Sequence, residues 1–154
     1  MANPVCEVLV TDAPLNAPEN EVDPAAGARV EFQGIVRGSE DGREIEGIDY
    51  EAHREMAEHQ LKQIAGQAAI QFEVRSVIVH HRVGFVAVGE PSLFMRVCSG
   101  HREAAFQASR WIVDELKKKV PIGKRPRFKS EALCGASHPP LQSYGAPGSQ
   151  ATTV

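Results

Sequence analysis

The stretch Val97–Phe128, VCSGHREAAFQASRWIVDELKKKVPIGKRPRF, decides the fold and carries the most informative charges of the chain. Its apolar residues recur at helical spacing: Ala105, Phe106, Ala108, Ile112, Val113 and Leu116. This pattern predicts a helix that packs one face on a core, with a cap at Ser99 or Gly100. His101 and Arg102 then lie in its first turn, where the helix dipole disfavours cations. An anion bound to the free backbone N–H groups of this turn would explain why two potential cations lie there.

The other end of this predicted helix is basic as well. Lys117, Lys118 and Lys119 end it, Pro121 stops it, and a loop from Gly123 returns more basic residues: Lys124, Arg125, Arg127 and Lys129. Lysines in a last turn complement the dipole for at most about 1 kcal/mol and are often only solvated, which accounts for Lys118 and Lys119. The dipole does not account for the basic run beyond Pro121. An anionic ligand, a partner's carboxylate and a nucleic-acid backbone remain open as its occupant.

Composition limits these choices. With 154 residues, 42% of them hydrophobic and 24% charged, the chain fits one soluble domain with a real core. The net charge of -3 argues against general nucleic-acid binding, and Phe128 is the one stacking aromatic in the basic run. Cys6, Cys98 and Cys134 form no CxxC pair, which favours a reducing compartment and neither disulfides nor a zinc site.

The remaining segments predict a mixed architecture. No basic region precedes the first apolar patch and no apolar run reaches about 20 residues, so we expect a cytoplasmic protein without a signal peptide or membrane span. Strands are predicted at 5–11, 27–37, 45–52, 72–83, 85–88 and 92–98, and the strand at 92–98 is expected to be the last one. The strands at 27–37 and 45–52 are expected to pair as a hairpin. A helix is predicted at 54–69. Residues 13–26 are a proline-rich loop. Residues 130–154 are a Gly/Pro-rich tail expected to be disordered or to order only against a partner.

A few single residues invite functional readings. Arg37 lies where a strand runs out, and Gly34 within that strand leaves room for a close neighbour. His80 and His81 point to opposite faces of their strand, so at most one reaches a given site. His53 and His59 lack further ligands at a metal-binding spacing and read as surface residues. Cys98 is expected beside the helix start, most simply as a small buried hydrophobe.

Four motifs occur in an order that resembles the large, catalytic subunit of molybdopterin synthase. They are Phe32-Gln-Gly-Ile-Val-Arg37, His81-Arg-Val-Gly84, Ser99-Gly-His-Arg102 at a helix start, and Asp114-Glu-Leu-Lys117 continuing through Pro121 to Lys124. The stretch Tyr50–Met56 also resembles the family's entry into its first long helix. The likeness covers residues 5–128, so we expect one domain at 1–129 followed by the tail.

The resemblance implies an α+β fold of the α/β-hammerhead kind, with a mixed sheet and two main helices. It implies a homodimer within a heterotetramer, in which a small ubiquitin-like subunit inserts its C-terminal Gly-Gly as a thiocarboxylate. The implied reaction transfers two sulfurs to cyclic pyranopterin monophosphate (precursor Z) to give molybdopterin. No cofactor, metal, nucleic acid or membrane is expected.

The resemblance also assigns site residues. Lys117 and Lys124 would be catalytic, Lys117 by stabilising an oxyanion or shuttling a proton and Lys124 by orienting the substrate. The substrate-binding set would comprise Ile35, Val36, Arg37, His101, Arg102, Lys117, Lys124, Arg125 and Pro126. The chain has Gly123 where the family commonly has an aromatic residue, and Pro126 where it has an acidic one. A pterin- or partner-binding module without turnover is therefore the alternative function.

Overall fold

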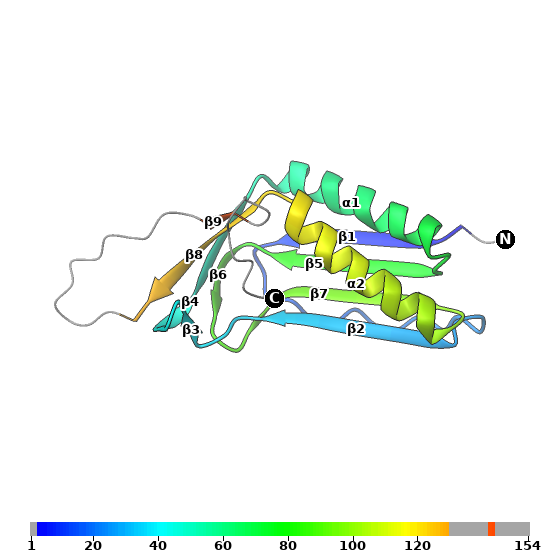
Figure 1. Cartoon of the computed structure of the whole chain (residues 1–154), viewed down its shortest axis with the longest axis horizontal. Coiled ribbons are helices and arrows are strands. Elements are labelled where there is room, and N and C mark those ends of the chain that lie inside the picture. The colour runs from blue at the N-terminus through cyan, green and yellow to red at the C-terminus, as the bar shows by residue number, and fades with distance from the viewer. Residues whose placement is uncertain (1–2, 130–141, 144–154) are drawn as a thin grey trace.

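The computed structural model describes residues 3–129 and 142–143, which form two sheets and two helices (Figure 1). The elements are β1 (Val5–Thr11), β2 (Ala28–Ile35), β3 (Ser39–Glu40), β4 (Arg43–Ala52), α1 (Arg54–Gln71), β5 (Ser76–Arg82), β6 (Gly84–Ala87), β7 (Pro91–Ser99), α2 (Arg102–Lys119), β8 (Ile122–Phe128) and β9 (Gln142–Ser143). The α+β class with two main helices is confirmed. The rest of the predicted tail lies outside the described residues.

The first sheet has the strand order β1-β5-β7-β2, and both helices cover one of its faces (Figure 1). β1 runs parallel to β5, whereas β5–β7 and β7–β2 are antiparallel, so the sheet is mixed. Strands on a one-sided sheet alternate, and β2 does so, with Val30, Phe32 and Gly34 on its more buried face. β2 and β1 are the edges of this sheet.

The core lies between this sheet and the helices. It contains the predicted stripe of α2, whose members Ala105, Ala108, Ile112 and Leu116 are at most 1% exposed. Phe106 is 62% exposed, so the expectation that it widens the stripe is wrong. At 100° per residue Phe106 lies on the flank of α2, one residue beyond the buried face. Val113 is half-buried and does pack against the core.

The second sheet has the order β3-β4-β8-β9, with β6 also pairing with β4. The predicted hairpin between 27–37 and 45–52 is therefore wrong. β2 instead pairs with β7, and the hairpin is the short one between β3 and β4. Asp41 and Gly42 form its turn with φ of 51° and 75°, the backbone that a tight two-residue hairpin requires.

β8 corrects a second expectation, because residues 122–128 were predicted as a loop and 92–98 as the last strand. β8 is antiparallel to β4 from Ile122↔Ala52 to Phe128↔Ile45. Gly123 and Pro126 are poor strand residues, so local propensity concealed the strand and long-range pairing with β4 imposes it. The strand carries Lys124 back beneath the C-terminal end of α2.

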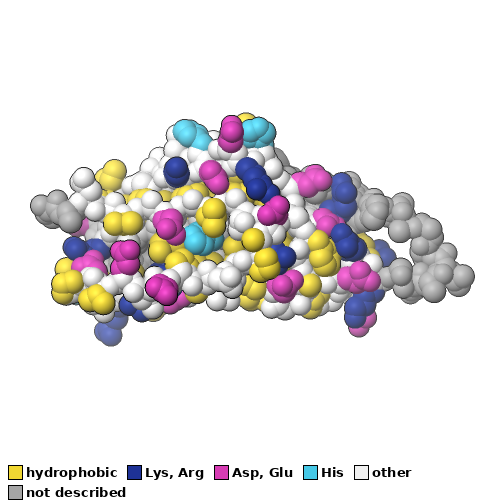
Figure 2. All heavy atoms as spheres, turned by 180° about the vertical axis from the view of Figure 1, so that it is seen from behind, with side chains coloured by type: hydrophobic (Ala, Val, Ile, Leu, Met, Phe, Trp, Pro, Cys, Tyr) yellow, Lys and Arg dark blue, Asp and Glu magenta, His cyan; other side chains and the backbone are white. Residues whose placement is uncertain are grey.

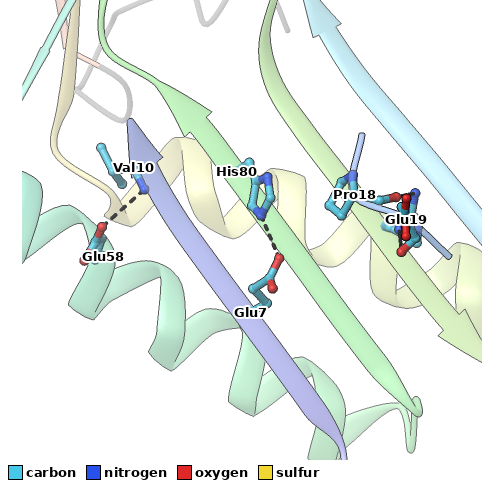
Figure 3. Close-up of polar contacts among 7 residues, drawn as sticks. Glu7, Val10, Pro18, Glu19, Glu58 and His80 are labelled. Carbon is cyan, nitrogen blue, oxygen red and sulfur yellow. Dashed lines mark hydrogen bonds and ion pairs between the residues drawn. The ribbon is translucent and has the colours of Figure 1, made fainter. Parts of the chain in front are cut away.

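The segment 12–27, here called the strap, crosses the face of the first sheet that the helices leave open. Arg96 on β7 fastens it: its Nη2 donates to the carbonyl oxygen of Pro18 at 2.8 Å, and Nη1 reaches that of Glu19 at 3.5 Å. Arg75 and Asp23 form a second attachment, with Nη2 3.2 Å from Oδ1. Figure 3 shows Pro18 and Glu19 lying over this sheet, on the side away from the helices.

Candidate active site

Lys117 lies half-buried in the last turn of α2. Its pKa is lowered, chiefly because burial penalises the charged ammonium. The carboxylate of Asp114, one turn earlier, opposes this shift, while the positive charges of Lys124 and Arg37 add to it. Lys124 and Arg37 therefore lie within electrostatic range of Lys117, and we call the three residues the Lys117 cluster. Lys117 therefore gives up its proton more readily than an ordinary lysine does.

Lys124 enters this cluster from β8. Its side chain is 4% exposed, and its Nζ donates to Oε1 of Glu40 at 3.3 Å. Glu40 lies on β3, between the predicted strands at 27–37 and 45–52, and it was not among the predicted site residues. No local signal marks it, because the two partners are 84 residues apart in the chain.

Arg37 follows the end of β2 and is exposed, as expected for a strand-end arginine. The neighbouring backbone is already engaged: Val36 N donates to the Glu90 carbonyl oxygen at 3.1 Å, and Gly89 N donates to the Val36 carbonyl oxygen at 2.9 Å. Val36 is buried and Ile35 is 38% exposed. Of the predicted group, Arg37 and the Ile35 side chain thus face outward, whereas Val36 holds the turn after β6.

Arg125 and Pro126 divide between the two faces of β8. Pro126 is buried on the face of Lys124, because residues two apart on a strand share a face. Arg125 lies on the other face with Arg127, whose guanidinium pairs with Asp49 and stacks over Phe85. Of these two predicted substrate-binding residues, the structure places Pro126, and not Arg125, on the side of the Lys117 cluster.

His101 is the N-cap residue of α2, so the expected cap at Ser99 or Gly100 is wrong. Its side chain makes no capping hydrogen bond, and both His101 and Arg102 are exposed. The backbone of Gly100 packs against Gly27: a Cβ on Gly27 would lie 2.4 Å from the carbonyl oxygen of Gly100. This close approach fixes the chain just before the helix starts. The N-cap histidine of α1 behaves differently: His53 Nδ1 accepts a hydrogen bond from Met56 N at 3.3 Å.

Within one chain the predicted cations form two groups. The 18 residues of α2 span about 27 Å at about 1.5 Å per residue, so His101 and Arg102 lie far from the Lys117 cluster. Figure 1 shows the two ends of α2 at opposite ends of the first sheet. A cavity that uses both groups would need a second copy of the chain.

The strand histidines lie outside both groups. His80 faces the open side of the first sheet, where its Nε2 is 2.8 Å from Oε2 of Glu7 (Figure 3). His81 faces the core and is fully buried, with Nδ1 2.8 Å from the Arg82 carbonyl oxygen and its ring edge-on to Tyr50. Burial lowers the pKa of His81 to about 4, so it is neutral at physiological pH.

Other candidate sites receive little support. Cys98 lines a cavity of about 640 Å³ beneath the strap, on the opposite face from α2, and not the helix start as expected. No cluster of three His, Cys, Asp or Glu side chains suited to a metal occurs within residues 3–129.

Neither described helix is long and apolar enough to cross a membrane. On the face shown in Figure 2, acidic and basic side chains are interspersed, unlike a nucleic-acid-binding surface.

Comparison with known proteins gives a consistent result. The MoaE protein family model matches residues 10–119, which includes Lys117 but ends before Lys124. The molybdopterin synthase catalytic subunit of Thermoplasma volcanium is 39% identical over 126 residues, covering 81% of this chain and 92% of that relative.

Two solved structures share the fold. Molybdopterin synthase from Staphylococcus aureus has a TM-score of 0.74 at 27% identity, covering 79% of this chain and 90% of its own. A complex of subunits 1 and 2 of molybdopterin-converting factor from Helicobacter pylori has a TM-score of 0.59 at 18% identity, covering 83% and 92%. On the family match and the archaeal relative, the chain belongs to the MoaE family, the catalytic subunits of molybdopterin synthase.

Proposed function

We propose that this chain transfers two sulfurs from the thiocarboxylated C-terminus of a small ubiquitin-like carrier to cyclic pyranopterin monophosphate, and that the Lys117 cluster is its reaction centre. The observation that carries the proposal is the half-buried amine of Lys117, whose pKa is lowered by burial and by the nearby charges of Lys124 and Arg37. The Helicobacter complex contains two different subunits, which is consistent with a protein partner for this chain.

The chemistry of sulfur transfer matches these side chains. Each carrier supplies one sulfur, which forms a carbon–sulfur bond to the pterin; the acyl–sulfur bond then breaks as water attacks the carbonyl, and the carrier leaves as a carboxylate. That attack develops negative charge on oxygen, which a positioned cation stabilises. An amine whose pKa is lowered by burial gives up its proton more readily than an ordinary lysine does, so Lys117 can pass a proton between the reacting groups. In this proposal Lys117 acts at the carbonyl, Lys124 orients the substrate and offsets the charge that develops, and Arg37 binds the phosphate from the open end of β2.

A second copy of the chain would bring the distant cations to this centre. Arg102, Phe106, Val113 and Lys117 follow one another along the flank of α2, at spacings of four, seven and four residues. Phe106 is 62% exposed on this flank, and the adjacent β2 is an edge strand. A two-fold axis across the β2 edge makes the two α2 helices antiparallel, so that the partner subunit's Arg102 approaches Lys117. This dimer would be the core of the heterotetramer.

Reconstitution tests the proposal directly. The purified chain is mixed with precursor Z and a carrier ending in Gly-Gly thiocarboxylate, and formation of the dithiolene product is measured. We expect product with the thiocarboxylated carrier and none with the same carrier ending in an ordinary carboxylate. The alternative, a binding module, predicts that carrier and pterin bind without product, so this result would replace the proposed function by the alternative.

A further inference from the structure

The pair of Glu40 and Lys124 differs from the other ion pairs of the described residues. Both side chains are 4% exposed, and Nζ lies 3.3 Å from Oε1. In each of the other pairs at least one side chain is more than a third exposed to solvent. Two charges have thus been taken out of water together next to Lys117.

Stability alone is a weak reason to bury such a pair. Removing an ammonium and a carboxylate from water costs several kcal/mol for each ion, and well-packed apolar residues often stabilise a core equally well or better. A buried charge pair is better explained where a charge must be held in one place. Lys124 is such a charge, since it comes from the inner face of β8 and its field reaches Lys117.

The backbone that carries Glu40 is built to hold it in place. Glu40 pairs with Arg43 across the β3–β4 hairpin, immediately before the tight turn at Asp41 and Gly42. β4 in turn pairs with β8, where Tyr50 lies opposite Lys124. One continuous set of strands therefore fixes both the carboxylate and the lysine that it contacts.

We propose that Glu40 is the positioning residue for Lys124, holding its ammonium group at the inner face of β8 in the orientation that sulfur transfer requires. The inference rests on the proposed function, because it gives Glu40 a role only through the part that Lys124 plays in turnover. Glu40 itself does not contact the substrate. A carboxylate supplied by the β3–β4 hairpin thus belongs to the reaction centre, although it lies in a segment with no catalytic motif.

The test is a kinetic comparison of Glu40→Gln, Glu40→Asp and a control. Glutamine keeps the shape and removes the charge, so we expect kcat to fall roughly 10- to 100-fold, as for a misplaced catalytic group, while KM for the pterin changes less than about two-fold. Aspartate keeps the charge but withdraws it by one methylene, so its kcat should be intermediate. The control is Glu44→Gln on β4, whose exposed pair with Lys129 spans 3.7 Å and whose loss should leave kcat unchanged.

Melting temperature separates positioning from folding. Glu40→Gln leaves the Lys124 ammonium buried without its counter-charge and should lower the melting temperature. Its kcat is therefore measured well below that temperature, where the variant is folded, and an unchanged kcat there would overturn the inference. If Glu40→Gln does not fold, Glu40→Asp decides the matter, and a wild-type kcat there would overturn the inference. Failure of the proposed function is visible separately, as absence of product with the wild-type chain, and would overturn both.

Discussion

The two ends of α2 carry similar charges in very different surroundings. At the C-terminal end Lys117 is half-buried near Lys124 and Arg37, and its pKa is lowered. At the N-terminal end His101 and Arg102 are exposed, and the N-cap side chain makes no capping hydrogen bond. Burial therefore distinguishes the end whose lysine has a lowered pKa from the end whose cations are exposed to solvent.

The largest effect should come from Lys117→Ala. Loss of a group that exchanges protons or stabilises an oxyanion lowers turnover by roughly 10²- to 10⁴-fold. Stability should change little, because Lys117 is only half-buried and lies near like charges. The matched control is Lys118→Ala, which removes an exposed lysine from the same turn and should keep near-normal turnover. Equal activity of the two variants in the reconstituted assay would contradict the claim that the half-buried Lys117, and not the exposed Lys118, takes part in turnover.

Mixing two defective chains tests whether the ends of α2 meet across a dimer. Arg102→Ala alone should lower turnover roughly 10- to 100-fold, by loss of one cation at a charged centre. If the partner subunit's Arg102 completes each site, a mixed dimer of Arg102→Ala and Lys117→Ala chains has one site with both defects and one intact. Random exchange then restores about a quarter of wild-type activity, because half of the dimers are mixed. Absence of any recovery after exchange would place Arg102 outside the site.

A pH effect on stability should arise from the buried histidine of β5, His81. His81 has a pKa of about 4 when folded, against 6.5 ordinarily, a difference worth about 3 kcal/mol. The unfolded chain takes up this proton as the pH falls through 6.5 and the folded chain only near 4, so stability is lost across that window. Urea unfolding between pH 7.5 and 4.5 measures it. His81→Asn should flatten the slope, whereas replacement of the exposed His59 should leave it unchanged.

The smallest expected effect concerns the N-cap of α2. Asparagine at this position caps a helix with its side chain, so His101→Asn should stabilise the chain by about 0.5–1 kcal/mol. The same change should lower turnover if His101 serves the site of a neighbouring copy. Thermal unfolding and the reconstituted assay, run on one preparation, measure both. A gain in stability with unchanged turnover would show that the side chain of His101 has no role in the reaction.

Sequence periodicity predicted the elements of the first sheet and both helices because their apolar residues face one core. It did not predict β8, where Gly123, Pro126 and three basic residues give no strand pattern and the partner strand β4 supplies the order. The pairing of β2 with β7 was missed for a related reason. A hairpin is the simplest connection between neighbouring strands, and only the whole fold shows that β4 belongs to the other sheet.

The site was predictable to a similar degree. Motif resemblance selected Lys117, Lys124 and Arg37, and the structure places Lys124 and Arg37 within electrostatic range of Lys117. It also selected Arg125, which strand alternation turns to the other face of β8. Glu40 was not predicted as a site residue, because nothing in its local sequence indicates a contact with a lysine 84 residues away. Contacts of that kind become visible only when distant strands are paired.

The way the strap is attached determines which of its residues can be substituted and where a label can be placed on it. Arg96 holds it through the carbonyl oxygens of Pro18 and Glu19, groups that every amino acid possesses. Substitutions along the strap therefore leave this attachment in place, except where Asp23 pairs with Arg75 and where Gly27 closely approaches Gly100. Val22, 95% exposed at its outer surface, is a suitable place for a fluorophore or an affinity peptide, remote from the C-terminal end of α2.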